Sequence, residues 1–431
     1  MAQSPAIAAI AADLKPHMIL SVPAPPARRT EPLVALGLAA GPVVALGFTR
    51  FAYALLLPAM REQLSWTFAA AGGMNTANAV GYILGALSAA WWSRRLGARA
   101  AFGWGIALSA VTLLLSAATG TYAVLAALRF LGGVTTAVTF VVGSALAARI
   151  HTGGDQPRSA RLVALYMAGV GIGIVAAGLV VPAATTLFGA SGWRIGWLAM
   201  GALSLLALAP AIWATRRVPD PAAPAPGATE RAGLRALTPT FAWYLLFGAG
   251  YVAYMTFVVA LLRTQGLGAA AEAAFFVVLG LSSATGTLTI WARVTGRLRG
   301  GRAPALVSTV VLAGVLPVLL WHGLPAALAS AVVFGAAFMA GPTAATVLVR
   351  RALPPHAWTR GIALLTAAFS IGQAFGPLVS GLLSDTTGGI ARGLWLSAAL
   401  LALAAVAALP QREPAPSPAP HREPVTAAST R

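Results

Sequence analysis

One stretch decides how the chain is organised: residues 216 to 239 read RRVPDPAAPAPGATERAGLRALTP. It is the only long internal segment that is hydrophilic, and its proline and charge content is typical of a linker. Six apolar runs precede it and six follow it. Each is about 20 residues or longer, enough for a helix to cross the hydrocarbon core of a bilayer. The sequence therefore predicts an all-α membrane protein with twelve transmembrane helices in two six-helix bundles.

The predicted spans are bounded by charged residues, prolines and glycines. They lie near 33–60, 67–92, 100–118, 122–148, 161–187 and 193–215, and then near 240–262, 271–292, 303–321, 325–349, 360–384 and 391–410. The resulting organisation is an N-terminal cytoplasmic tail (1–32), an N-terminal bundle (33–215), a cytoplasmic linker (216–239), a C-terminal bundle (240–410) and a cytoplasmic tail (411–431). We expect that last tail to be disordered, because it is rich in proline and almost without bulky apolar residues.

The balance of charge is strongly basic, with 29 Lys and Arg against 10 Asp and Glu. Such an excess can indicate nucleic-acid binding, but most of these residues lie in the two tails and in alternate short loops. This bias is typical of the cytoplasmic loops of membrane proteins. We therefore predict a multi-pass protein of the bacterial inner (plasma) membrane with both termini cytoplasmic, a monomer whose partners are the lipid bilayer and a small-molecule solute, and no nucleic acid. Residues 1–30 lack the basic and apolar pattern of a cleavable signal peptide.

Residue types argue against several kinds of chemistry. The chain has no cysteine, which excludes disulfides, thiolate nucleophiles and cysteine-based metal sites. All five histidines lie in predicted tails or loops, and every acidic residue lies in a predicted tail, loop or helix end. We therefore expect neither an enzyme nor a metal site, and no cofactor.

Two neighbouring segments carry a family resemblance: GFTRFAYALLLPAMREQLS (47–65) and AAAGGMNTANAVGYILGAL (69–87). They closely resemble the YbfB/YjiJ-like (MFS_4-type) branch of the major facilitator superfamily, and LRFLGGV (128–134), LFGAGYVAYMTFVVALL (246–262) and GIALLTAAFSIGQAFGPLVSGLLSD (361–385) support this. The similarity covers roughly residues 30 to 410. It implies two six-helix bundles, alternating access and transport driven by a gradient. No GxxxxGK[ST] motif for ATP is present, which agrees.

The resemblance also assigns a gating loop after the second helix, which reads SRRLGARA (93–100). Arg95, Gly97 and Arg99 match the superfamily pattern, whereas Arg94 stands where an acidic residue is usual. The usual charge relay of that loop is therefore not expected in its ordinary form. In the fourth helix, Arg129 followed by small residues also matches the superfamily.

Arg50 and Arg129 are the most informative residues, because a charge near the bilayer centre costs about 2.5 to 3.5 kcal/mol and usually faces a cavity. Neither has an acidic partner within a predicted span. One hypothesis is that at least one of them neutralises an anionic solute, since a guanidinium suits carboxylate or phosphate. The alternative is that each binds backbone carbonyls and waters and so braces its helix.

Polar side chains spaced three, four or seven residues apart share a helix face, and such stripes supply the candidate substrate-binding residues. They are Arg50 and Tyr53; Asn75, Asn78 and Tyr82; Arg129; Tyr251 and Tyr254; and Thr366, Ser370 and Gln373. The alternative is ordinary hydrogen bonding between helices. Gly81 with Gly85 and Gly372 with Gly376 predict close helix contacts.

These features predict a secondary transporter that moves a small solute by alternating access, with a small organic anion as the first choice. Efflux of hydrophobic drug-like compounds and a non-transporting sensor or scaffold remain alternatives. Coupling is also open, because proton carriers are commonly intramembrane carboxylates or histidines. The only nearby candidates are Glu62, Glu272 and Asp385, near the predicted outer ends of the first, eighth and eleventh helices, so uniport and anion exchange are considered as well as proton coupling.

Overall fold

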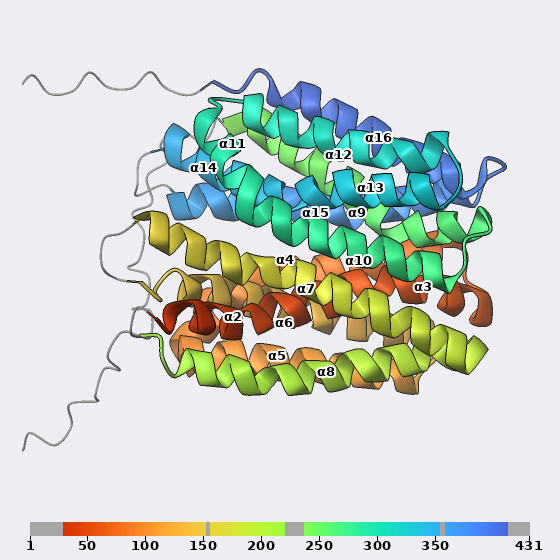
Figure 1. Cartoon of the computed structure of the whole chain (residues 1–431), viewed down its shortest axis with the longest axis horizontal. Helices are drawn as coiled ribbons and strands as arrows, with labels where there is room; N and C mark the ends of the chain where they lie inside the picture. The colour runs from red at the N-terminus through yellow and green to blue at the C-terminus, as the bar shows by residue number, and fades with distance from the viewer. Residues whose placement is uncertain (1–28, 152–155, 220–236, 354–357, 413–431) are drawn as a thin grey trace, which may run out of the picture.

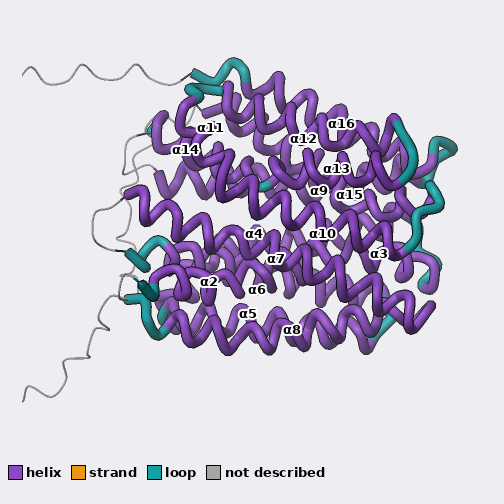
Figure 2. Tube along the Cα trace, viewed as in Figure 1, coloured by secondary structure: helices purple, strands orange, loops and turns teal. Residues whose placement is uncertain are grey.

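The structure is a computed structural model that describes residues 29–151, 156–219, 237–353 and 358–412. Within these ranges the chain forms only helices and loops (Figure 2), as the composition predicts. The helices run roughly parallel to one long axis, and the helices of the two halves of the chain lie side by side (Figure 1). The prediction of an all-α fold with two helical bundles is confirmed.

The N-terminal bundle begins with one long helix that has three consecutive parts. Its elements are α2 (Glu31–Pro42), η1 (Val43–Phe51), α3 (Ala52–Gln63), α4 (Phe68–Leu96), α5 (Ala98–Ala118), α6 (Tyr122–Ala147), α7 (Gln156–Phe188), η2 (Gly189–Ser191) and α8 (Gly192–Thr215). Inside the bundle α4 packs on α6, and α5 packs on both α6 and α8. Gly81 and Gly85 allow the first of these contacts, because a Cβ at either would lie within 2.3 Å of a carbonyl oxygen of α6.

The C-terminal bundle repeats this architecture. Its elements are α9 (Thr238–Thr264), α10 (Ala269–Thr285), η4 (Gly286–Trp291), α11 (Ala292–Arg297), α12 (Arg302–Leu320), α13 (Leu324–Phe338), α14 (Ala340–Ala352), α15 (Trp358–Ser384) and α16 (Gly389–Ala408). The tenth predicted span is interrupted between α13 and α14. Within this bundle α9 packs on α15 and α16, and Gly372 and Gly376 bring α15 close to the backbone of α9.

Eleven helices in the described ranges are long and apolar enough to cross a membrane. The helix outside this group is α4, whose first half carries Asn75 and Asn78. Both asparagines are buried against protein, which explains how a helix with two polar residues can cross the membrane. We therefore assign α4 as the second of the twelve predicted helices.

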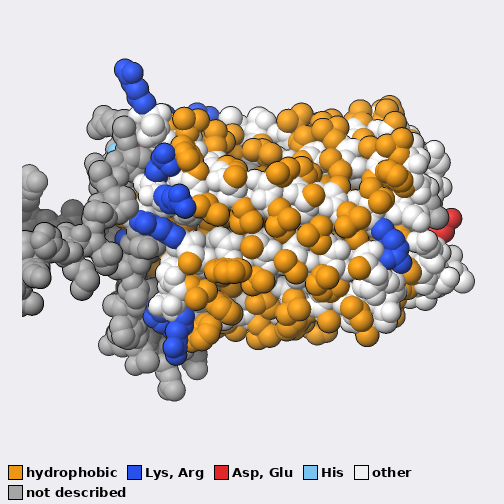
Figure 3. Space-filling view, turned by 90° about the horizontal axis from the view of Figure 1, so that it is seen from below, with side chains coloured by type: hydrophobic (Ala, Val, Ile, Leu, Met, Phe, Trp, Pro, Cys, Tyr) orange, Lys and Arg blue, Asp and Glu red, His pale blue; other side chains and the backbone are white. Residues whose placement is uncertain are grey.

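The molecular surface has an apolar body and two unlike ends (Figure 3). Arg94, Arg95, Arg216, Arg217 and Arg351 lie at or just beyond helix termini at one end, which we call the arginine-rich end. The other end, where α3 ends and α4 begins, we call the opposite end.

Candidate functional site

A stretch of π-helix positions the most informative arginine. Arg50 lies near the end of η1, where the Thr49 hydroxyl donates to the Val44 carbonyl five residues earlier, at 2.9 Å. Gly47 packs so closely on α7 that a Cβ there would lie 2.5 Å from the Gly173 Cα. Insertions of π-helix inside α-helices occur frequently at functional sites, and this nine-residue stretch carries Arg50 at the interface between the bundles.

Arg50 reaches across that interface. Its Nη2 donates to the Gln373 side-chain oxygen at 2.5 Å, and the Gln373 amide donates to the Tyr251 hydroxyl at 2.7 Å. Its guanidinium carbon lies 5.6 Å from the centre of the Tyr82 ring. The side chain is 7% exposed, and no carboxylate pairs with it among the described residues. Arg50 is therefore a buried charge with neutral partners.

Arg129 on α6 is held differently. One terminal nitrogen donates to the Thr49 carbonyl, and the other donates to the Asn75 side-chain oxygen at 2.9 Å. The guanidinium also lies over the Tyr53 and Trp197 rings, 4.6 and 5.9 Å from their centres. These contacts lie within the N-terminal bundle and match the bracing role considered for this residue.

A second polar connection joins the bundles through Asn75. Its amide donates to the Thr256 hydroxyl of α9 at 2.6 Å, while Asn78 donates to the backbone carbonyl of Arg129 at 3.0 Å. Thr256 was not among the candidates from the sequence. The one signal for it was a second type of hydroxyl, two residues after Tyr254, in a largely apolar part of α9.

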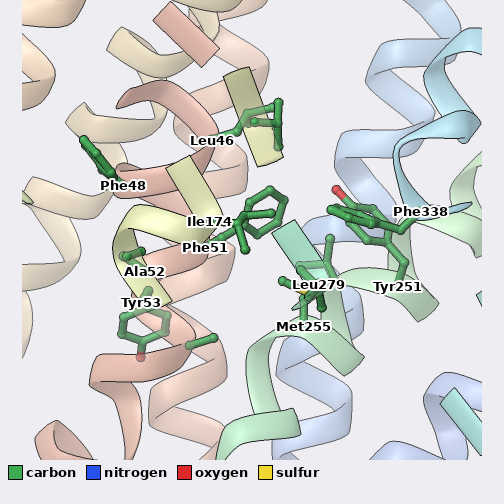
Figure 4. Close-up of a cluster of buried hydrophobic side chains, with 14 of the residues drawn as sticks. Leu46, Phe48, Phe51, Ala52, Tyr53, Ile174, Tyr251, Met255, Leu279 and Phe338 are labelled. Carbon is green, nitrogen blue, oxygen red and sulfur yellow. The ribbon is translucent and has the colours of Figure 1, made fainter. Parts of the chain in front are cut away.

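Little space remains at this centre. A cavity of about 10 Å³ lies against Arg50, Asn75 and Thr256, which is room for about one water molecule. Apolar side chains close the surroundings: Phe51 meets Phe338 of the other bundle edge to face, with ring centres 5.7 Å apart (Figure 4).

Space lies instead between α4, α6 and α15, toward the arginine-rich end. This region, which we call the α4–α15 cleft, has a volume of about 850 Å³. Its polar lining residues are Ser93, Arg94, Thr366 and Ser370, and the rest are Ala, Val, Leu and Ile. The predicted residues Thr366 and Ser370 therefore lie in this cleft and not at Arg50.

At the opposite end the same two helices are in tight contact. The Asp385 carboxylate accepts hydrogen bonds from the backbone amides of Phe68 and Ala69, both at 2.8 Å, and so caps α4 from the other bundle. A Cβ at Gly72 would lie 2.4 Å from the Pro377 carbonyl oxygen. The faces of α4 and α15 that touch here separate toward the arginine-rich end, where they line the cleft.

Other predicted residues make their hydrogen bonds elsewhere. Tyr254 bonds to Ser330 inside the C-terminal bundle, and Tyr53 donates to the Ala71 carbonyl at 2.9 Å besides lying under Arg129. Glu272 forms a two-point ion pair with Arg263, at 2.5 and 3.2 Å.

The predicted gating loop contacts the N-terminal bundle. Gly97 ends α4 with a φ of 82°, a conformation that favours glycine. Arg99 donates two hydrogen bonds to the Val218 carbonyl, at 3.1 and 2.7 Å, and so ties α5 to the end of α8. Arg95 lies over the Trp91 ring, 5.7 Å from its centre.

Family comparison agrees with this architecture. Residues 42–409 match the family model described as "Uncharacterised MFS-type transporter YbfB". The chain belongs to this family of major facilitator superfamily transporters. A curated relative of the transporter is a chloramphenicol resistance protein from Streptomyces lividans, which is 32% identical over 386 residues, 86% of this chain and 94% of that protein.

Solved structures similar to the transporter share its fold at low sequence identity. A mutant of the nucleoside transporter NupG is 17% identical, with a TM-score of 0.69 over 88% of this chain and 99% of that one. A bacterial homologue of the human lysosomal transporter Spinster, in an inward-facing and unoccupied conformation, is 17% identical, with a TM-score of 0.65 over 90% and 100% of the two chains. A D-xylose–proton symporter is 16% identical, with a TM-score of 0.65 over 88% and 95%.

Proposed function

We propose that this major facilitator transporter moves a small organic anion across the bacterial inner membrane by alternating access. The observation that carries the proposal is Arg50, a buried guanidinium at the interface between the bundles whose partners are neutral. A charge in such a place is expensive and usually marks a solute or ion pathway.

The chemistry of Arg50 suits a carboxylate or phosphate. Only one of its nitrogens has a hydrogen bond among the described residues, to Gln373. A carboxylate can accept two parallel hydrogen bonds from one guanidinium, and charge-assisted bonds are roughly twice as strong as neutral ones. An anionic solute would therefore displace Gln373 from Arg50 and compensate the buried charge.

The two ends of the molecule support a direction of opening. α4 and α15 are in tight contact at the opposite end, and a cleft separates them at the arginine-rich end. An inward-facing state requires this arrangement. Because positive residues favour cytoplasmic loops, we place the arginine-rich end and both termini in the cytoplasm. The opposite end is then the outer end.

The residues around Arg50 and Arg129 also bear on whether transport is coupled to proton movement. Among the described residues, the polar cluster around Arg50 and Arg129 contains neither carboxylate nor histidine. We therefore propose uniport or anion exchange beside proton coupling, which would have to use Glu62, Glu272 or Asp385 near the outer end.

Efflux of hydrophobic drug-like compounds is the second candidate. It is favoured by the 32% identity to a chloramphenicol resistance protein and by the largely apolar lining of the cleft. A non-transporting sensor or scaffold is the alternative from another class, and solute flux in proteoliposomes separates it from both forms of transport.

The decisive experiment is a thermal-shift screen of the purified protein against small carboxylates, sugars and hydrophobic cations, followed by flux in proteoliposomes. A ligand that binds only the folded state must stabilise it. We expect stabilisation by a carboxylate that disappears in Arg50→Gln, together with its transport. Stabilisation only by neutral or cationic compounds, unchanged in Arg50→Gln, would reject the anion and favour efflux of drug-like molecules.

A further inference from the structure

We propose that the α4–α15 cleft binds an amphipathic anion, with its acidic group at Arg94 and its apolar body between α4 and α15. This inference rests on the proposed transport function and narrows its substrate class to single-chain amphiphiles with one acidic group. It also gives the cleft a role separate from Arg50, as the site where the solute binds before it reaches the centre.

Size is the first argument. The cleft has about 850 Å³, within the range of sites that hold drug-sized ligands. Its wall on α4 runs from Ile83 to Arg94, which is about 16 Å of helix at 1.5 Å per residue. The cavity at Arg50 has about 10 Å³. In this conformation an elongated solute fits the cleft and does not fit the centre.

Charge is the second argument. Arg94 is the only charged residue that lines the cleft, among the described residues. It is exposed near the end of α4, and no hydrogen bond or ion pair engages its guanidinium there. The remaining walls are mostly aliphatic. Contact between such a wall and an apolar chain is favourable, because it removes apolar surface from water. One cation at the mouth of an apolar cleft complements one anionic group on an apolar body.

A buried hydroxyl gives the third argument. Ser370 is 0% exposed, lines the cleft, and its hydroxyl oxygen has no hydrogen-bond partner among the described residues. It lies at the end of the cleft away from Arg94, where the apolar body of the solute would end, so it marks the depth of the cleft and is not a contact of the acidic group. Gln373, the partner of Arg50, lies three residues further along the same helix. The cleft therefore leads from Arg94 to within one helical turn of the residue that contacts Arg50.

The cleft is also open at its side. Leu87 and Val141 line it and are 65% and 38% exposed, which places its entrance on the apolar surface of the molecule. An amphipathic solute would therefore enter from the inner leaflet, with its acidic group near the headgroups and Arg94.

The test is photoaffinity labelling in nanodiscs of phosphatidylcholine, with a twelve-carbon carboxylate that carries an aliphatic diazirine as the probe. Labelled peptides are quantified by mass spectrometry, with dodecanoate and dodecanol as competitors. We expect labels within 83–98 and 362–370, competed by dodecanoate and not by dodecanol. Arg94→Gln should reduce labelling about three- to fivefold, as for loss of an exposed ion pair.

Two Ala→Phe variants test whether a ring that fills the cleft blocks labelling, or whether any added large side chain does so. Ala90→Phe places a ring in the cleft, whereas Ala202→Phe places one on the exposed surface of α8. Ala90→Phe should lose most of the labelling and Ala202→Phe should keep it. Equal labelling in the two variants, or equal competition by dodecanol, would overturn the proposal.

Arg50→Gln distinguishes failure of this inference from failure of the proposed function. It should keep the labelling of the cleft and lose transport. Labelling that vanishes in Arg50→Gln would assign the probe to the centre and overturn the cleft site. Labelling of the cleft in a protein that transports no anion would reject the proposed function and leave the cleft site standing. A phospholipid that co-purifies with the wild type but not with Ala90→Phe, and that dodecanoate cannot displace, would also overturn the proposal.

Discussion

Asp385→Asn should shift the transporter toward its outward-open state. The carboxylate of Asp385 caps the first turn of α4 across the interface between the bundles, with two hydrogen bonds of 2.8 Å from the amides of Phe68 and Ala69. Asparagine keeps the shape but removes the negative charge and one acceptor. Because the contact exists only while α4 and α15 touch at the opposite end, its loss raises the free energy of this conformation alone.

The magnitude follows from the setting of Asp385. A carboxylate at a helix N-terminus contributes about 0.3 to 1 kcal/mol when exposed and up to about 2 kcal/mol when partly buried. Asp385 is exposed, so we take about 1 kcal/mol. Since about 1.4 kcal/mol corresponds to a factor of ten, the ratio of outward-open to inward-facing molecules should rise about fivefold.

The assay is double electron–electron resonance between nitroxide labels at Thr121 and His322. These residues lie in loops at the opposite end of the two bundles, and the chain has no cysteine to replace first. Glu62→Gln is the matched control, because it makes the same type of change at an exposed outer residue with no hydrogen bond across the interface among the described residues. An unchanged distance distribution in Asp385→Asn, or an equal shift in Glu62→Gln, would refute the reasoning.

Three further predictions concern stability and gating. Arg129→Gln removes hydrogen bonds and ring contacts inside one bundle, so it should lower the thermal unfolding midpoint more than Arg50→Gln does; equal midpoints would contradict its bracing role. Glu272→Gln removes the ion pair between the buried Glu272 and Arg263, which is about a third exposed. We expect a loss of about 1 to 2 kcal/mol in a thermal unfolding assay, between the values for exposed and buried pairs, and no change in the protonophore sensitivity of transport. A changed sensitivity would make Glu272 a proton carrier. Gly72→Val should force α4 and α15 apart at the opposite end and lengthen the distance between the labels at Thr121 and His322. Gly103→Val should not, because a Cβ at Gly103 meets nothing within 4 Å. A longer distance in both variants would contradict the argument from close packing.

Much of the architecture follows from local properties of the sequence. The length of the apolar runs, the hydrophilic segment 216–239 and the alternation of arginine-rich loops predict two bundles of membrane-length helices, because crossing a bilayer constrains each segment separately. Paired glycines likewise predict close helix contacts, since only a residue without a Cβ lets two backbones approach. The two central arginines stand out for the same local reason, which is the cost of a charge in a span.

Only the tertiary structure decides which side chains the predicted polar residues contact. Tyr251 and Tyr254 are three residues apart, about 300° around a helix, and the remaining 60° is enough to direct Tyr251 to Gln373 and Tyr254 to Ser330. Ser370 and Gln373 likewise share a stripe, yet one lines the cleft and the other contacts Arg50. Spacing along a helix defines a face, whereas the crossing angle and separation of two helices decide what that face meets. Those quantities depend on packing between bundles that are distant in sequence, so no local pattern contains them.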